Sequence, residues 1–465
     1  MVDNAIINEQ QIIDILAHNK GSNDKGLVRE VLAKSLELKG LSLKEVASLL
    51  NLDDEELLNK LFQVANLVKE KIYGKRLVIF APLYISNHCT NNCLYCAFRT
   101  GNGELMRKTL TQYEIAEETK YLIDQGHRRI LLVAGENYAQ DNFEYILDSI
   151  ATIYDVQGKN GRICRINTNI ASLTLENFRL LKSAKIGTYQ LFQETYHRDT
   201  YEKMHLSGKK MDYFWHLTTM DRAMAAGIDD VGIGALLGLA DWKFELLAMM
   251  QHINHLSSEF GVGPHTISVP RLEPASGSEI SVSPPNPVTD LDFCKIIAIL
   301  RLAVPYTGII LSTRESTDIR RRALNLGISQ ISAGSRTNPG GYSDETDKFD
   351  SSQFSLGDHR SLDEVIKDIV SFGYMPSFCT ACYQLGRTGE NFMELAKTGE
   401  IGNMCLPNAI VTFREYLQKY ATEHTKIMGE ELITKEIESL NTPRKDLIKQ
   451  LISKMDVNNS QEVLV

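Results

Sequence analysis

The sequence predicts an α/β protein, a (β/α)8 TIM-type barrel with an N-terminal helical segment before it and a helical C-terminal domain after it. Two observations lead to this fold. From residue 76 onward, short apolar stretches alternate with helical patterns, and there are eight strand–helix units. Strict alternation with continuously apolar strands indicates parallel strands joined by helices, and eight units are the count of this barrel. An open, doubly wound sheet is the alternative, but no Gly-x-Gly-x-x-Gly follows the first strand.

The elements follow in order along the chain. Residues 1–75 repeat apolar residues at helical spacing and are expected to form an N-terminal helical segment. The barrel is expected at 76–372, with strands at 76–86, 128–135, 161–169, 186–195, 228–238, 265–271, 308–315 and 328–335. Its clearest helical patterns are at 111–126, 173–184, 213–227, 242–260 and, closing the barrel, 361–374. Residues 373–465 are expected to form a C-terminal domain with helices at 408–424 and 430–441.

The composition argues against several classes of function. The 465 residues are 43% hydrophobic and 23% charged, as in ordinary globular proteins. A net charge of -9 argues against a nucleic-acid partner, and the densest basic run, 319–325, is expected to be one turn of a solvated helix. No apolar run has the length of a membrane span, and the N-terminus does not resemble a secretory signal, so a cytoplasmic protein without a membrane partner is expected.

The cysteines favour metal sites over disulfides. Thiols in a cytoplasmic protein stay reduced, and Cys164 and Cys294, which stand alone in apolar contexts, are expected to be core residues. The other six form two triads. The first, spaced C-x3-C-x2-C, is Cys89, Cys93 and Cys96, and the second, spaced C-x2-C-x22-C, is Cys379, Cys382 and Cys405.

The first triad follows the first strand, on the catalytic face of such a barrel. Thiolates are the ligands of iron–sulfur clusters, and three of them leave one iron of a four-iron cluster open to a small molecule. On spacing alone, a structural zinc ion with His88 as a fourth ligand is the alternative.

The triad, with the aromatic Tyr95 before its last cysteine, resembles the radical S-adenosylmethionine (SAM) superfamily. The resemblance implies a 4Fe-4S cluster whose open iron chelates SAM and whose electron cleaves SAM to a 5'-deoxyadenosyl radical. It also implies that Tyr95 contacts the adenine. Ala134, Gly135 and Glu136 stand where the family has Gly-Gly-Glu, whose backbone holds the methionine amine. The alanine is a departure that keeps the backbone acceptor.

Polar residues also follow other strands, and the eighth strand ends in "SAGSRTNPGGY". Charge at four strand ends around one mouth suggests a site for a zwitterion, because a guanidinium binds a carboxylate with two hydrogen bonds. The residues are Gln193, Glu194 and Arg198 after the fourth strand, Arg271 and Glu273 after the sixth, and Thr313, Arg314 and Glu315 after the seventh.

Together these segments, over about residues 76–345, resemble the aromatic amino-acid lyases of the superfamily. Those are the tyrosine lyases of thiamine biosynthesis and of FeFe-hydrogenase maturation. The resemblance implies L-tyrosine as substrate and cleavage of its Cα–Cβ bond to p-cresol and dehydroglycine. Arg314 and Ser335 are expected to hold tyrosine, with Gln193 in the same catalytic site. Glu194 and Arg198 are expected to position SAM or each other.

The second triad separates the two kinds of lyase, because the hydrogenase-maturation lyases carry its spacing in an added C-terminal domain. The resemblance therefore implies a second iron–sulfur cluster. A small structural zinc site is the alternative, although His424 lies 19 residues beyond Cys405. Each helix of a barrel runs antiparallel to its strand, so the chain near Gly373 should emerge at the bottom face, opposite the first triad. A strand of about six residues separates the faces by about 20 Å. An internal channel lined by residues of 232–238 and 332–335 is predicted, and an axis sealed by Leu, Ile and Phe would contradict it.

His265 begins the sixth strand and so belongs to the bottom mouth, where a lone histidine is usually a core or surface residue. In the resembling lyases a histidine at the matching "GPHTI" position ligates an extra iron attached to the second cluster. There dehydroglycine would yield CO and cyanide, with free L-cysteine as co-ligand, and the iron dicarbonyl cyanide unit would pass to other hydrogenase maturation proteins. A ferredoxin or flavodoxin would donate the electron. Two rivals remain: a thiamine-pathway 2-iminoacetate synthase with an incidental metal site, and a non-catalytic iron–sulfur scaffold.

Overall fold

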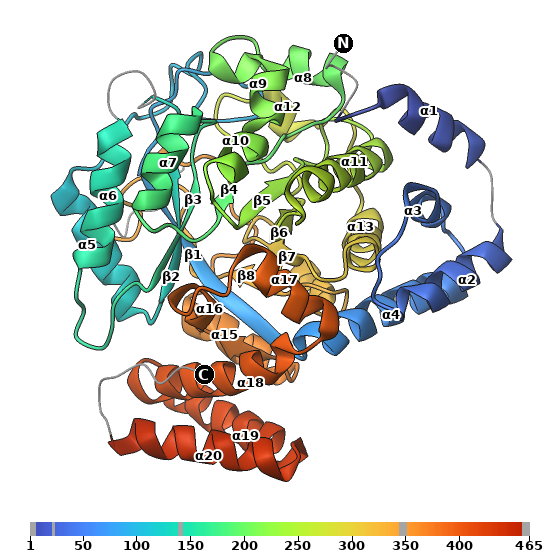
Figure 1. Cartoon of the computed structure of the whole chain (residues 1–465). Helices are drawn as coiled ribbons and strands as arrows, with labels where there is room; N and C mark the ends of the chain where they lie inside the picture. Colours follow the sequence, from blue (N-terminus) through green and yellow to red (C-terminus); the bar gives the residue numbers. More distant parts are fainter. Residues whose placement is uncertain (1–5, 21–23, 138–142, 344–350, 458–465) are drawn as a thin grey trace.

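The centre of the chain is a closed ring of eight parallel strands (Figure 1). The structure, a computed structural model, describes residues 6–20, 24–137, 143–343 and 351–457. Each strand pairs with the next along the chain, and β1 closes the ring by pairing with both β2 and β8. The predicted (β/α)8 barrel is therefore confirmed. The strands are β1 (Arg76–Ser86), β2 (Arg129–Ala134), β3 (Arg165–Asn169), β4 (Tyr189–Gln190), β5 (Val231–Gly234), β6 (Thr266–Ser268), β7 (Gly308–Leu311) and β8 (Gln330–Ser332).

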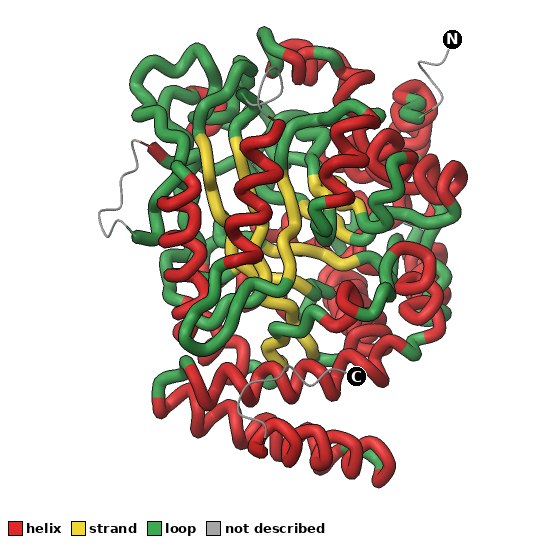
Figure 2. Tube along the Cα trace, turned by 60° about the vertical axis from the view of Figure 1, so that its left-hand side comes forward, coloured by secondary structure: helices red, strands yellow, loops and turns green. Residues whose placement is uncertain are grey.

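Helices surround this ring, as Figure 2 shows with the strands in yellow. The expected helix at 242–260 has the observed bounds, whereas the pattern at 213–227 divides into α9 and α10. The barrel helices are α5 (Gln112–Asp124), α6 (Phe143–Asp155), α7 (Leu175–Ser183), α8 (Arg198–Met204), η1 (Lys209–Met211), α9 (Tyr213–Leu217), α10 (Thr219–Ala225), α11 (Trp242–Phe260), α12 (Glu279–Val282), α13 (Asp290–Ala303), α14 (Thr317–Leu324) and α15 (Leu362–Ser371).

The N-terminal segment is helical, as predicted, and packs on one side of the barrel (Figure 1). Helix α4 packs against α13, and α1 and α3 pack against α11. The chain breaks between α3 and α4 because the Asp54 carboxylate accepts the Leu57 backbone N–H and so caps a new helix. The helices are α1 (Glu9–His18), α2 (Lys25–Ser35), α3 (Leu43–Leu50) and α4 (Glu55–Tyr73).

The C-terminal segment begins with a strand that the sequence did not predict. Strand β9 (Met375–Ser377) pairs in parallel with the first residues of β1, from Arg76 to Val78. This pairing carries the second triad to the bottom of the barrel, where α18 packs against β9, α19 and α20 (Figure 1). The helices are α16 (Ala381–Gln384), α17 (Gly389–Thr398), α18 (Ile401–Lys419), α19 (Glu423–Ser439) and α20 (Thr442–Val457). One apolar core runs from α1 to α20, so the division into three domains stays a prediction.

Two expectations about exposure were wrong for one residue each. The basic run 319–325 lies mostly in α14 and exposes Arg322, as expected of a solvated helical turn, but Arg320 is only 1% exposed. Helical spacing places Arg320 on the inner face with Ile319 and Ala323, and an ion pair of 2.9 Å with Asp358 compensates its charge. Cys294 is a core residue in α13 as expected, but Cys164 is only half-buried.

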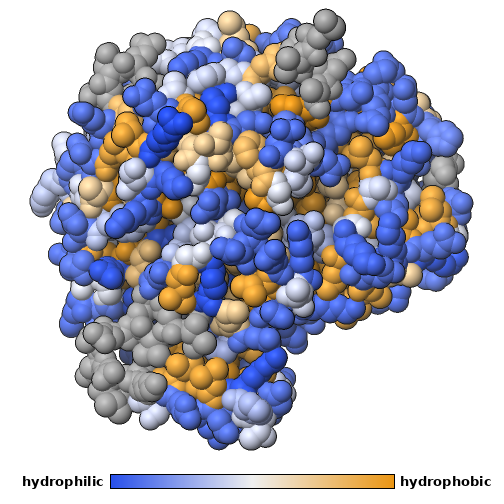
Figure 3. All heavy atoms as spheres, viewed as in Figure 1, coloured by the Kyte–Doolittle hydropathy of each residue, from blue (hydrophilic) through white to orange (hydrophobic). Residues whose placement is uncertain are grey.

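The surface shows no segregation of apolar side chains on the face drawn in Figure 3, where apolar and polar residues are interspersed. Across the described ranges, no helix combines the length and the hydrophobicity that crossing a membrane requires.

Candidate functional site

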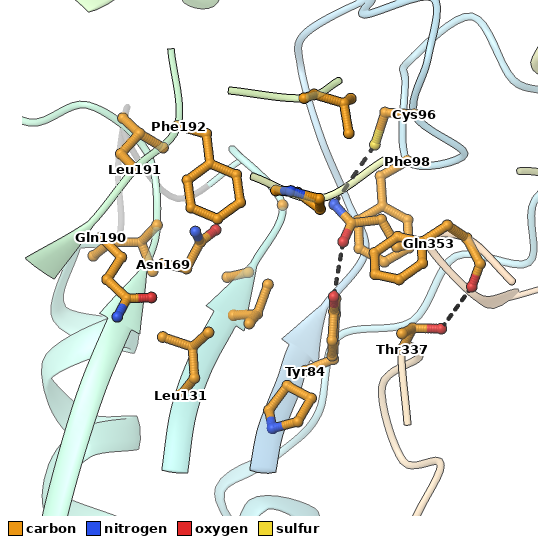
Figure 4. A pocket seen from close by; sticks show the side chains of 18 of the residues that line it. Tyr84, Cys96, Phe98, Leu131, Asn169, Gln190, Leu191, Phe192, Thr337 and Gln353 are labelled. Carbon is orange, nitrogen blue, oxygen red and sulfur yellow. Dashed lines mark hydrogen bonds between the residues drawn. The ribbon is translucent and has the colours of Figure 1, made fainter. Parts of the chain in front are cut away.

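A cavity of about 210 Å³ opens inside the barrel toward the carboxyl ends of the strands, and we term it the upper cavity (Figure 4). Its wall comes from seven of the eight strands and from loops that follow strands, with Leu236 on the loop after β5 in place of a residue of that strand. In Figure 4, Tyr84 of β1, Leu131 of β2 and Gln190 of β4 extend from these strands toward it, and Cys96 lies across from them. This is the end of the barrel where enzymes of the fold place their reacting groups.

The first triad forms one side of the upper cavity, because Cys89, Cys93 and Cys96 all line it. Their loop is held by residues that the sequence did not single out: the Leu94 N–H donates to the Met204 carbonyl at 2.9 Å, and a backbone bridge joins Cys93 to His205. Burial raises the pKa of all three thiols, to about 11 for Cys96. The thiols therefore keep their protons until a metal displaces them. Three cysteines on the wall of one cavity supply the type of ligand that an iron–sulfur cluster takes, although among the described residues no three His, Cys, Asp or Glu side chains are gathered closely enough to hold a single metal ion.

Tyr95 lies against the same cavity and is held by a histidine. The His205 Nδ1 is 2.8 Å from the Tyr201 carbonyl and therefore carries the proton. Its Nε2 then accepts from the Tyr95 hydroxyl at 2.8 Å. Burial lowers the pKa of His205 to about 3, so this neutral tautomer persists. The ring at the expected adenine position is thus fixed by its own hydroxyl group.

The Ala134-Gly135-Glu136 turn after β2 also lines the upper cavity. Glycine is required at its centre, because a Cβ on Gly135 would lie 2.2 Å from the His88 carbonyl oxygen. The Glu136 carboxylate accepts from the Asn91 amide, and its backbone carbonyl accepts from the Thr90 N–H at 3.0 Å. This turn is therefore tied to the loop that carries the first triad.

Glu194 pairs with a lysine rather than with Arg198. The Lys210 Nζ lies 2.6 Å from the Glu194 Oε1, and both residues line the upper cavity. Burial opposes the lysine charge, but the Glu194 carboxylate, through its charge and its hydrogen bond, outweighs it and holds the pKa of Lys210 above its ordinary value. Arg198 begins α8 with its guanidinium against the rings of Tyr213 and Phe214, 5.4 and 4.8 Å from their centroids.

Of the residues expected to bind tyrosine, Arg314 lines the upper cavity and stacks on Phe354, with its Cζ 3.3 Å from the ring centroid. Ser335 and Gln193 are buried but are not part of the lining, and Ser335 Oγ and Gln193 Nε2 lack hydrogen-bond partners within the described ranges. Their roles stay predictions. Arg271 is not part of the lining either. Its guanidinium forms an ion pair with the Glu315 carboxylate. Burial raises the pKa of Glu273 to about 7.

A second cavity, which we term the lower cavity, lies at the opposite end of the barrel. It is lined by Cys379, Cys382, Cys405 and His265, together with Arg76, Arg129 and Arg165, the first residues of β1, β2 and β3. The placement of the second triad at the bottom of the barrel is thus confirmed. Tyr84 of the upper cavity lies eight residues along β1 from Arg76, a distance of about 26 Å.

His265 lies beside a carboxylate in the lower cavity. Its Nδ1 lies 3.3 Å from the Asp230 Oδ1, which also accepts the Gly389 N–H at 3.0 Å, but Nδ1 makes no hydrogen bond within the described residues. Burial lowers the pKa of His265 to about 4, so the ring is neutral at pH 7. The nearby negative charge favours the proton on Nδ1, and the Nε2 lone pair is then available to a metal. Burial also raises the pKa of Cys379 to about 11. Thiols and a neutral imidazole are side chains of the types that ligate iron–sulfur clusters and iron.

The barrel interior between the two cavities is filled partly by polar side chains. Gln190 lines the upper cavity and Gln330 the lower one, while the Gln190 Nε2 donates to Thr266 Oγ1 at 3.4 Å. These side chains occupy space left by two glycines: a Cβ on Gly232 would lie 2.5 Å from the Thr266 Oγ1, and one on Gly308 2.7 Å from the Gln330 Nε2. The two cavities are separate volumes, but the axis is not closed by aliphatic and aromatic residues alone. The channel stays a prediction.

The chain is similar in sequence and in structure to proteins of known family. The family model of the radical SAM superfamily matches residues 83–250, and that of the Biotin and Thiamin Synthesis associated domain matches 268–375. The 2-iminoacetate synthase of Escherichia coli K12 is 32% identical over 358 residues, which are 77% of this chain and 92% of the relative. A crystal structure of HydG, a maturase of the FeFe-hydrogenase, superimposes with a TM-score of 0.95 at 49% identity, covering 99% of this chain and 100% of that one. The chain belongs to the HydG family of radical SAM enzymes. HydG from Carboxydothermus hydrogenoformans has a TM-score of 0.84 at 42% identity, covering 97% of this chain and 99% of that one.

Membership of this family confirms the predicted enzyme class and implies a 4Fe-4S cluster and SAM. The sequence missed several residues of the upper cavity, including Lys210, His216 and Gln353. His216 lies in α9, within the expected helix 213–227, and Lys210 lies in the short η1, but a helical pattern does not say which of its residues faces a cavity. Gln353 lies on a loop, whose local sequence carries no periodic signal. Tyr84 could have been found, since Val78, Phe80, Pro82 and Tyr84 alternate along β1 and all line one of the two cavities.

Proposed function

We propose that the chain is a radical SAM tyrosine lyase of FeFe-hydrogenase maturation. It cleaves the Cα–Cβ bond of L-tyrosine to p-cresol and dehydroglycine. It then converts dehydroglycine to CO and cyanide at the second triad, which yields an Fe(CO)2(CN) unit for the H-cluster. The observation that carries the proposal is the pair of cysteine triads at opposite ends of one barrel, each lining its own cavity. The relatives support it, because they include HydG structures matched over almost the whole chain.

In the upper cavity, the cluster would supply the electron that cleaves SAM. The residues of the chain bind and orient the two ligands. Tyr95 would hold the adenine, and the backbone of Gly135 and Glu136 would hold the methionine amine. Arg314 would bind the tyrosine carboxylate: it is half-buried in the cavity wall, stacked on Phe354, and paired with no carboxylate among the described residues. An unpaired cation in such a cavity favours a ligand that brings the missing negative charge.

In the lower cavity, Cys379, Cys382 and Cys405 would hold the second cluster and His265 the added iron. Three arginines at the strand starts give this cavity an excess of positive charge over its carboxylate, Asp230. Such a cavity suits anionic and thiolate groups. We propose free L-cysteine as co-ligand of the added iron, a ferredoxin or flavodoxin as electron donor, and other hydrogenase maturation proteins as acceptors of the product.

The decisive experiment separates the two ends of the barrel. A Cys379→Ala/Cys382→Ala/Cys405→Ala variant is expected to form p-cresol from tyrosine but neither CO nor cyanide, in an anaerobic assay with SAM and a reductant. The matched control is Cys294→Ala, a buried cysteine outside both cavities, which should form all three products. A wild-type chain that forms p-cresol without CO and cyanide would indicate a 2-iminoacetate synthase instead. A wild-type chain that does not cleave SAM under reduction would indicate an iron–sulfur scaffold.

A further inference from the structure

Residues 351–357, which follow β8 in the chain, contribute Gln353 and Phe354 to the wall of the upper cavity and are tied to three other segments by backbone hydrogen bonds. The Gln353 N–H donates to the Thr337 carbonyl at 2.9 Å, and the Gly357 N–H donates to the Thr313 carbonyl at 2.9 Å. The Ser355 N–H donates to the Pro274 carbonyl at 2.8 Å. These bonds reach the loops after β8, β7 and β6. The backbone position of Gln353 is therefore set by the barrel rather than by the loop alone.

The Gln353 side chain joins Tyr84 to Cys96 across the cavity (Figure 4). The Tyr84 hydroxyl donates to the Gln353 Oε1 at 2.8 Å, and the Gln353 Nε2 lies 3.7 Å from the Cys96 Sγ. Because the amide oxygen accepts from a hydroxyl, the amide nitrogen must be the atom that faces the sulfur. Burial raises the pKa of Tyr84 above its ordinary value, so the phenol remains a donor. The Tyr84 ring is held edge-on to Phe98, with centroids 6.0 Å apart.

The amide is one of few donors near the thiols of the first triad. Cys89 faces the backbone N–H groups of Asn91 and Glu136, and Cys96 faces that of Phe98 as well as Gln353. The backbone groups are present whatever the side chains are. The Gln353 donor belongs to a side chain, so replacing this residue by one without a polar hydrogen would remove the N–H that faces Cys96.

Hydrogen bonds to cluster sulfurs favour the reduced cluster, because reduction adds negative charge that the N–H dipole stabilises. We propose that Gln353 raises the reduction potential of the cluster at the first triad, and that Tyr84 is the positioning residue that directs its amide. The proposal rests on the cluster that membership of the family implies, and not on tyrosine cleavage. A side chain that only closed the cavity wall would act through its volume and would leave the potential unchanged.

The test is a redox titration of the reconstituted full-length holoenzyme followed by EPR, without tyrosine. The first cluster is identified by the change in its spectrum when SAM is added. Gln353→Leu keeps the approximate volume but removes the donor. It is expected to lower the ratio of reduced to oxidised cluster about tenfold at a fixed potential, equivalent to 59 mV for a one-electron couple. Tyr84→Phe, which leaves the amide in place but free to turn, should shift the potential in the same direction by less. The matched control, Gln157→Leu at an exposed position, should titrate as the wild type does.

A wild-type midpoint in Gln353→Leu with unchanged iron content would refute the proposal. If Gln353→Leu fails to retain its cluster, Tyr84→Phe decides alone: a lower potential supports the proposal, and an unchanged or higher one overturns it. Because no tyrosine is present, the result is independent of whether the chain is a tyrosine lyase.

Discussion

The ion pair between Lys210 and Glu194 should act as one unit in SAM binding. The two charged atoms lie 2.6 Å apart, and each side chain is 13% exposed, so solvent screens the pair only weakly. Lys210→Met leaves the Glu194 carboxylate without its cation, and Glu194→Gln leaves the lysine charge unpaired. Removing one partner of such a pair is expected to cost about 2 kcal/mol of binding free energy, or about 30-fold in the dissociation constant of SAM.

The double variant is the informative measurement. If the two residues act only through each other, Lys210→Met/Glu194→Gln should bind SAM about as weakly as either single variant, and not about 900-fold more weakly than the wild type. The assay is equilibrium binding of SAM, under anaerobic conditions, to reduced holoenzymes that have been matched for iron content. Lys209→Met is the matched control, because it removes the same charge from the adjacent, exposed position and should leave binding unchanged. Additive losses in the double variant would refute the reasoning.

Three further predictions concern tyrosine binding and stability. Arg314→Gln should raise the KM for tyrosine about 10- to 100-fold with SAM binding unchanged, as loss of a charge-assisted carboxylate contact requires, and an unchanged KM in steady-state p-cresol assays would contradict it. Asp358→Asn leaves Arg320, which is 1% exposed, without its carboxylate and should lower the free energy of unfolding by about 3 kcal/mol in urea denaturation. Asp318→Asn removes a carboxylate that is 89% exposed and pairs with Arg321, and should change this free energy by less than about 1 kcal/mol. Equal effects of the two variants would count against the burial argument. Burial lowers the pKa of His127 to about 3, so the unfolded chain takes up the proton at a higher pH than the folded chain does. The free energy of unfolding should therefore fall by about 1.4 kcal/mol per pH unit between about pH 6.5 and pH 3. His127→Leu should reduce this pH dependence in unfolding of the iron-free chain, and an identical slope would be inconsistent with this account.

Much of the fold was readable because it depends on local patterns and on chain direction. The strand β1 and the helix α11 were predicted with their observed bounds, since long apolar runs and helical spacing are strong local signals. Strand β9 was missed because three residues carry too little pattern and form a strand only through pairing with β1. Arg320 was misjudged because a charged run does not reveal which of its members faces a buried carboxylate.

By itself, the sequence determined the barrel, the two cysteine triads and their separation to opposite ends, because alternating strands and helices have a defined direction along the chain. It also determined His265 as a candidate at the lower mouth. The tertiary structure decided which residues complete the sites. Lys210 pairs with Glu194, His205 orients Tyr95, Asp230 lies beside His265, and Gln353 reaches Cys96 across 257 positions of sequence. Such contacts depend on how loops cross in space, and no periodic pattern in the chain encodes that path.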